Sequence, residues 1–300
     1  MIPERGDLIT DSKDIPLPQH RSHPREWRQN VYVYPVISRR SGGLSIGVNL
    51  NPDAACNLDC VYCQVDRSRV RSRRDIDLHR FQKELEWMIA DAKSGALFAD
   101  ANFANVPHTL REIKDIAFSG DGEPTACRHF RECVELVAAL WRKSDLPGCK
   151  IVLITNACYL TRPEVVAGLE IMDRSNGEIW AKLDAGSEAY YRRVNRPSHP
   201  LQHVIDNVIA AAGVRPVVIQ SLFMRLDDHP PDKPELQAYA DRLNEIVQGG
   251  GHIKYVQVYT VARPPAEGFV TPLTKDELEN IAALVRRRTG LLVMTFGVGG

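Results

Sequence analysis

The sequence lacks three features that would each indicate a particular class of protein. No apolar run approaches the ~20 residues that a membrane helix requires, and the polar start, MIPERGDLITDSKD, contains no signal-peptide core. Charge of one sign is not in surplus, because 38 basic residues balance 38 acidic ones. A protein that binds nucleic acid mainly through its phosphates needs a basic surplus. We therefore expect a cytoplasmic protein with no membrane partner, for which nucleic acid is not the favoured partner.

The composition is that of a folded chain with a large core. Of the 300 residues, 44% are hydrophobic and 25% are charged, which excludes overall disorder. The first ~40 residues are rich in Pro, Arg, His and Asp and show no sustained period. We expect residues 1–40 to form an extended N-terminal arm without a core, and residues 41–300 to form the main domain.

Beyond the arm, short β-rich runs alternate with longer helical patterns. The predicted strands are 45–50, 114–119, 150–155, 178–184, 214–224 and 253–261, with 291–296 as one more candidate. The predicted helices are 77–94, 127–143, 162–170, 201–212, 232–248 and 274–288, the last two with N-terminal caps at Asp232 and Thr274. This α/β alternation predicts a partial (β/α)6 TIM-like barrel, with a doubly wound sheet as the alternative. In both folds, functional residues follow the carboxyl ends of the strands.

The strongest motif is a cysteine triplet in the loop after the first predicted strand. Cys56, Cys60 and Cys63 form a C-x3-C-x2-C pattern within eight residues. Three thiolates so close together can hold one face of an iron–sulfur cluster and leave one iron open to a ligand. A zinc site completed by a distant histidine is the alternative, but a zinc site normally has a second chelating pair, and none is visible here.

With Tyr62 just before its last cysteine, the triplet resembles the signature of the radical S-adenosylmethionine (SAM) superfamily. The resemblance implies a [4Fe–4S] cluster on the three cysteines and SAM bound at the fourth iron. It also implies reductive cleavage of SAM to methionine and a 5′-deoxyadenosyl radical. Tyr62 would then flank the adenine of SAM.

A glycine-rich segment, Ser119-Gly120-Asp121-Gly122-Glu123-Pro124-Thr125, follows the second predicted strand. By itself the segment is compatible with an ordinary tight turn. Next to the cysteine loop, it resembles the superfamily segment that holds the methionyl amino group of SAM. The resemblance assigns this part of the SAM site to Gly120, Asp121, Gly122 and Glu123.

Polar residues at later strands complete the predicted site. Asn156 follows the third strand and Asp184 ends the fourth, where both could contact SAM or substrate or could equally satisfy loop amides. Gln220 and Gln257, on the fifth and sixth strands, are weaker candidates for ribose or substrate contacts. Lys182 shares a strand face with Asp184, so we expect the two to form an ion pair.

Further segments resemble the radical SAM subgroup related to wyosine-base synthases. They are VYPVISRR at 33–40, DAGS at 184–187 with YYRRVNRP at 190–197, and RPP at 263–265. Two features differ from that subgroup. Residues 1–55 contain no cysteine for a second cluster, and the chain lacks the basic surplus expected of a tRNA-binding enzyme. One local basic run, Arg67, Arg69, Arg71, Arg73 and Arg74, could bind phosphate or could be a solvated loop.

The other cysteines are Cys127, Cys133, Cys149 and Cys158. Their spacing offers no local pair that could chelate a metal, so we expect these four to be small residues of the core.

The sequence as a whole predicts a radical SAM enzyme that abstracts hydrogen from a small-molecule or nucleoside substrate and takes electrons from an external donor. Two alternatives are an activating enzyme for a glycyl-radical protein and a non-catalytic iron–sulfur or zinc redox module.

Overall fold

The computed structural model describes residues 27–65, 75–265 and 267–297. Eight strands form one curled sheet in the order β1-β2-β3-β4-β5-β6-β8-β10. Neighbouring strands from β2 to β10 are parallel, and β1 pairs antiparallel with β2 at one edge. The strands are β1 Val33–Ser38, β2 Gly43–Val48, β3 Ile113–Phe118, β4 Lys150–Thr155, β5 Gly177–Lys182, β6 Val217–Leu222, β8 Ile253–Tyr259 and β10 Val293–Phe296.

This architecture confirms the expected α/β class and the partial TIM-like barrel. The strand candidate at the C-terminal end is real and forms β10, the seventh parallel strand. A single strand was predicted over residues 214–224. The structure has the shorter strand β6, Val217–Leu222, followed by a separate strand β7, Met224–Leu226. Strand β7 pairs with β9, Val270–Pro272, in a small antiparallel sheet.

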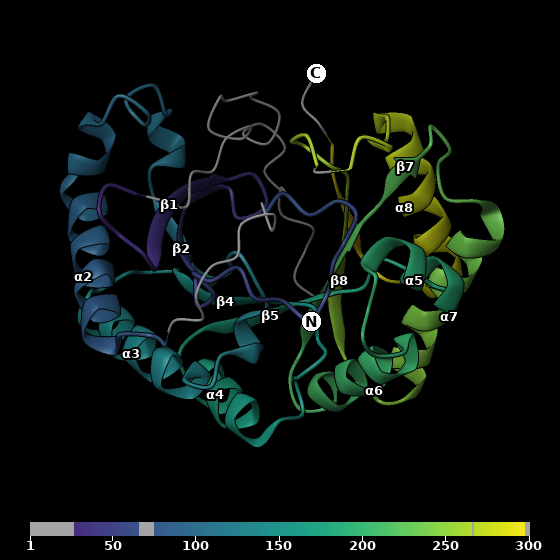
Figure 1. Cartoon of the computed structure of the whole chain (residues 1–300), viewed down its shortest axis with the longest axis horizontal. Helices are drawn as coiled ribbons and strands as arrows, with labels where there is room; N and C mark the ends of the chain where they lie inside the picture. Colours follow the sequence, from purple (N-terminus) through teal and green to yellow (C-terminus); the bar gives the residue numbers. More distant parts are fainter. Residues whose placement is uncertain (1–26, 66–74, 266, 298–300) are drawn as a thin grey trace, which may run out of the picture.

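Helices cover the outer side of the curled sheet (Figure 1). They are α2 Leu78–Ser94, α3 Phe130–Lys143, α4 Pro163–Asp173, α6 Leu201–Ala212, α7 Lys233–Gln248 and α8 Lys275–Thr289, while the short helix α5 Glu188–Asn195 contacts the cysteine loop. The predicted caps are confirmed: Asp232 accepts a hydrogen bond from the Glu235 amide, and Thr274 forms a capping box with Glu277. Helix α5 was not expected. None of the helices in the described part of the chain combines the length and apolar character of a membrane span.

The expectation that the first ~40 residues contribute no core is wrong for the described part of that segment. Val33–Ser38 is strand β1, and Trp27 and Tyr34 are buried. The carboxylate of Glu84 on α2, itself only 2% exposed, accepts hydrogen bonds from the amides of residues 31–33. These contacts attach the segment to the barrel, and the expected boundary at residue 40 falls within the β1–β2 hairpin. Residues 1–26 lie outside the described residues, so an arm there remains a prediction.

Inside the barrel, charged side chains form ion pairs at the amino ends of the strands, and polar side chains lie at the carboxyl ends. Along β5, Glu178, Trp180 and Lys182 alternate with residues of the outer core, as the two-residue period of a strand requires. Glu178, near the start of β5, binds Lys150 and Lys254 at 3.0 and 2.6 Å. Lys182, at the end of β5, therefore lies at the opposite end of the interior, where the parallel strands terminate together.

Candidate functional site

A cavity of about 340 Å³ lies inside the barrel and reaches the loops that follow the strands. All three cysteines of the triplet line it, together with the glycine-rich segment after β3. The predicted site residues that line the cavity are Cys56, Cys60, Tyr62, Cys63, Gly120, Asp121, Gly122, Glu123, Asn156 and Gln220. The structure therefore brings most of the predicted site together from strands that are distant in sequence.

The cysteine loop is fixed to helix α5 by its backbone. The amides of Asp59 and Val61 donate hydrogen bonds to the carbonyls of Asn195 and Val194 at 3.2 and 2.9 Å. The side-chain amide of Asn195 also donates to the sulfur of Cys60 at 3.4 Å. Helix α5 thus holds the middle of the triplet in place at the mouth of the barrel.

Cys60 lies in a position that favours a protonated thiol before a metal binds. Burial and the nearby charge of Asp184 raise the pKa of Cys60 to about 12, despite the hydrogen bond from Asn195. Metal ligation requires the thiolate, so binding must release this proton. The structure describes all seven cysteines, and none of them forms a disulfide bond.

The chemistry of this donor set fits an iron–sulfur cluster. Three soft thiol ligands from one loop line one cavity, and each cysteine of a cuboidal cluster binds a different iron. In the described ranges, no group of three or more His, Cys, Asp or Glu side chains is arranged to hold a single metal ion. Cys56, Cys60 and Cys63 are therefore the residues that would hold the cluster.

The glycine-rich segment lies directly against the cysteine loop, which explains both of its glycines. A Cβ atom at Gly122 would collide with the carbonyl oxygen of Ala55, and one at Gly120 would collide with the side chain of Asn49. Asn49 also donates a 2.9 Å hydrogen bond to Asp121 and accepts one from the Asp121 amide at 3.1 Å. The missing side chains allow the two loops to pack without a gap.

Glu123 connects the glycine-rich segment to the end of β4 through hydrogen bonds. Its carboxylate accepts hydrogen bonds from the hydroxyls of Thr125 and Thr155 and from the amides of Thr125 and Asn156, the last at 2.7 Å. Glu123 is 3% exposed, and burial raises its pKa. The side-chain amide of Asn156 donates to Asn57 in the cysteine loop at 2.8 Å. Both predicted residues thus organise the loops, and a direct contact of either with SAM remains a prediction.

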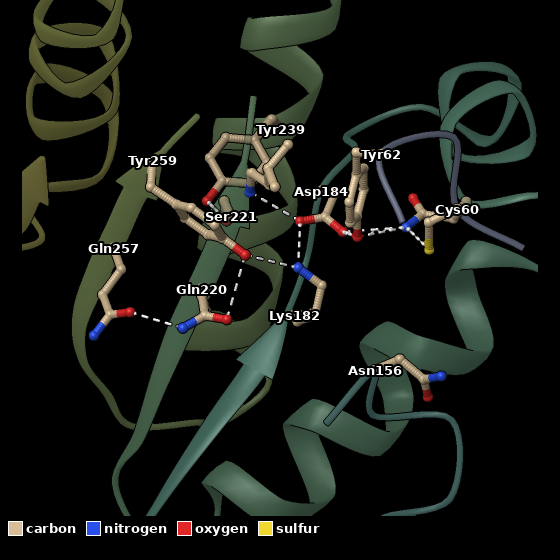
Figure 2. A network of polar contacts seen from close by, with 12 residues as sticks. Cys60, Tyr62, Asn156, Lys182, Asp184, Gln220, Ser221, Tyr239, Gln257 and Tyr259 are labelled. Atoms are coloured by element: carbon tan, nitrogen blue, oxygen red, sulfur yellow. Dashed lines mark hydrogen bonds and ion pairs between the residues drawn. The ribbon is translucent and has the colours of Figure 1, made fainter. Parts of the chain in front are cut away.

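Tyr62 and Asp184 connect the cysteine loop with the end of β5 (Figure 2). The Tyr62 hydroxyl donates to the Asp184 carboxylate, and Asn195 donates to the same oxygen at 3.1 Å. The other oxygen of Asp184 accepts from the Leu222 amide of β6 at 2.9 Å. Burial and the charge of Asp184 raise the pKa of Tyr62 well above its usual value, so Tyr62 remains a hydrogen-bond donor.

The network continues across the barrel interior to the two predicted glutamines. Lys182 forms the expected ion pair with Asp184, at 3.3 Å, and donates to the Tyr259 hydroxyl at 3.0 Å. Tyr259 donates to Gln220 at 3.4 Å, and Gln220 donates to Gln257 at 2.9 Å (Figure 2). Although burial opposes it, the charge of Asp184 raises the pKa of Lys182, which remains a cation at neutral pH.

Several residues of the site were not predicted as site residues. Asn195 and Tyr259 connect the network, and Arg39, Arg40 and Trp180 line the cavity. Asn195 and both arginines belong to segments that had been matched only as part of the subgroup resemblance, and no spacing signal in them assigns a role. The basic run at 67–74 lies outside the described residues. Among the remaining cysteines, Cys133, Cys149 and Cys158 are buried as expected, whereas Cys127 is half-buried.

Comparison with known families agrees with this geometry. A model described as the radical SAM superfamily matches residues 50–233, which include the cysteine loop, the glycine-rich segment, Asn156, Asp184 and Gln220. The chain belongs to the radical SAM superfamily. A [4Fe–4S] cluster and SAM are therefore its cofactors, and the chain is an enzyme rather than a non-catalytic redox module.

Individual relatives are distant. The chain is 26% identical over 260 residues to UPF0026 protein MJ1312 of Methanocaldococcus jannaschii, covering 85% of this chain and 71% of that protein. A radical SAM methyltransferase from Sphaerobacter thermophilus has a similar fold, with a TM-score of 0.60, 13% identity and coverage of 88% and 69% of the two chains. TYW1 with a lysine-pyruvate adduct gives a TM-score of 0.51 and 14% identity, covering 81% and 73%. These likenesses confirm the fold expected from the subgroup resemblance.

Proposed function

We propose that this enzyme cleaves SAM reductively at a cluster held by Cys56, Cys60 and Cys63 and abstracts hydrogen from a small-molecule substrate inside the barrel. The observation that carries the proposal is that the three cysteines and the glycine-rich segment line one cavity with the polar network of β5, β6 and β8. When bound, the cluster supplies the electron that splits SAM into methionine and a 5′-deoxyadenosyl radical.

The residues around the cavity would bind SAM and protect the reaction from water. Gly120 and Gly122 line the cavity beside the cysteine loop, and their close packing against Asn49 and Ala55 would place this segment next to the methionyl end of SAM. Tyr62, held by Asp184, presents its ring beside the cluster loop for the adenine. Trp180 and the apolar side chains packed around it form part of the interior, where they would shield a reactive species from water and side reactions.

The test is a comparison of cysteine variants in anaerobically reconstituted protein. Wild-type protein should bind iron and sulfide and convert SAM to 5′-deoxyadenosine when an external reductant is supplied. Cys60→Ala should lose both properties. Cys149→Ala is the matched control, because Cys149 is a buried thiol of the outer core that does not line the cavity. A triple variant of Cys56, Cys60 and Cys63 that still cleaves SAM would overturn the proposal.

A further inference from the structure

Two adjacent arginines extend from the β1–β2 turn into the cavity. Arg39 and Arg40 both line it, although they come from the amino end of β2 and the cysteine loop follows its carboxyl end. The guanidinium carbon of Arg40 lies 5.6 Å from the ring centre of Trp180 and 5.2 Å from that of Tyr259. At these distances, attraction between a cation and an aromatic ring holds the guanidinium in position.

The charges of these two arginines are only partly balanced by the acids of the cavity. Within the described ranges, no carboxylate forms an ion pair with either side chain, and Arg39 donates instead to the carbonyl of Gly297. Asp115, which also lines the cavity, accepts hydrogen bonds from the hydroxyls of Ser41 and Ser45, and burial raises its pKa although the charge of Arg40 opposes this shift. Burial and the charge of Arg40 lower the pKa of Arg39, as expected for two cations held near each other.

The other carboxylates around the cavity are bound elsewhere. Glu123 binds the ends of β3 and β4, Asp121 binds Asn49, and Asp184 binds Lys182 and Tyr62. The two guanidinium groups therefore have one carboxylate nearby, that of Asp115, which leaves a local surplus of positive charge at Arg39 and Arg40. A guanidinium is a planar donor that fits the two oxygens of a carboxylate or phosphate group.

We propose that Arg39 and Arg40 bind an anionic group, carboxylate or phosphate, of the substrate. This inference rests on the proposed function, because it assigns the cavity beyond SAM to the substrate. An anionic group at the arginines would direct the rest of the molecule towards the cysteine loop, where hydrogen is to be abstracted. The aromatic rings of Trp180 and Tyr259 hold Arg40 in advance, so little side-chain freedom is lost on binding.

The test measures binding of simple anions to the reconstituted full chain. Inorganic phosphate and succinate are titrated separately, and tryptophan fluorescence is followed because Trp180 contacts Arg40. We expect saturable binding of at least one anion, at least tenfold weaker in Arg40→Gln and in Arg39→Gln, and less affected in Arg40→Lys. Arg131→Gln is the matched control, because Arg131 is an exposed arginine of α3 that pairs with Glu135 and does not line the cavity. The fluorescence change should disappear in Trp180→Phe.

The outcomes separate this inference from the proposed function. Preference for phosphate would assign a phosphorylated substrate, and preference for succinate would assign a carboxylate. Unchanged affinity in folded Arg40→Gln and Arg39→Gln, or no saturable binding, would overturn the inference while SAM cleavage by the wild type still supports the proposed function. Competition between SAM and the anion would also overturn it, because the arginines would then belong to the SAM site. Anion binding in a protein that fails to cleave SAM would instead reject the proposed function.

Discussion

The hydroxyl of Tyr62 donates a hydrogen bond to the carboxylate of Asp184, which joins the cysteine loop to the end of strand β5. The two residues are 122 positions apart in sequence, and the same carboxylate pairs with Lys182 and accepts from Asn195. Asp184 is 3% exposed, so its charge is tolerated only because these donors surround it. Its side chain therefore supports both the shape of the site and the stability of the barrel.

Replacing Asp184 by Asn should destabilise the protein strongly, because Lys182 would remain buried without its counterion. Loss of one partner of a buried ion pair costs about 3–5 kcal/mol. Urea denaturation should show this loss in Asp184→Asn, and a smaller additional loss when the same change is made in Lys182→Met. Asp227→Asn, which removes an exposed ion pair with Arg193, is the control and should change little. Equal losses in both backgrounds would show that the pair is not coupled.

Gly122→Ala should displace the cysteine loop, because the added methyl group would meet the carbonyl oxygen of Ala55. Overpacking of this kind costs about 1–3 kcal/mol, and a shift of Ala55 to relieve it would move the adjacent Cys56. We expect reconstituted Gly122→Ala to bind less iron and sulfide per chain than the wild type. Gly268→Ala is the control, since a methyl group there would contact nothing within 4 Å. Normal cluster content in Gly122→Ala would show that the loops do not need this close packing.

The sequence predicts the parts of this site that depend on short spacing. The cysteine triplet and the glycine-rich segment are local patterns, and the order of strands follows from their alternation with helices. Strand β1 was missed because Pro35 cannot donate to a sheet ladder, and proline in a strand is tolerated mainly at an edge, which is where β1 lies. Arg40 could not be placed, because its contacts with Trp180 and Tyr259 depend on how far the sheet curls.

Glu123→Gln should lower stability, because Glu123 accepts hydrogen bonds at both of its carboxylate oxygens. Glutamine has one accepting oxygen, so its amide nitrogen would face donors from Thr125, Thr155 or Asn156. A buried donor left without an acceptor costs about 1–3 kcal/mol. Thermal and urea unfolding should show this loss, whereas Glu170→Gln on the exposed face of α4 should not. A variant of normal stability with weaker SAM affinity would instead assign Glu123 a direct contact with SAM.

The ion pairs at the amino ends of the strands predict a pH-dependent stability. Burial would raise the pKa of Glu178, but hydrogen bonds from Lys254, Trp180 and Lys150 outweigh burial and lower it below the usual 4.5. A lowered carboxyl pKa adds stability that is fully present above about pH 4.5 and is lost as the pH falls through the folded-state value. The wild type should therefore exceed Glu178→Gln in unfolding free energy at pH 7, and this difference should shrink between about pH 5 and pH 3.

Urea denaturation of both proteins across that range measures the effect, with Glu170→Gln expected to follow the wild type at every pH. Glutamine at position 178 keeps the size of the side chain and an oxygen acceptor for the indole of Trp180, but its amide nitrogen cannot accept from Lys254, so the pH dependence of the difference, rather than its size at pH 7, reports the charge. If the difference between the wild type and Glu178→Gln stays constant from pH 7 to pH 3, ionisation of Glu178 does not stabilise the fold, and its contacts with Lys150 and Lys254 contribute only packing.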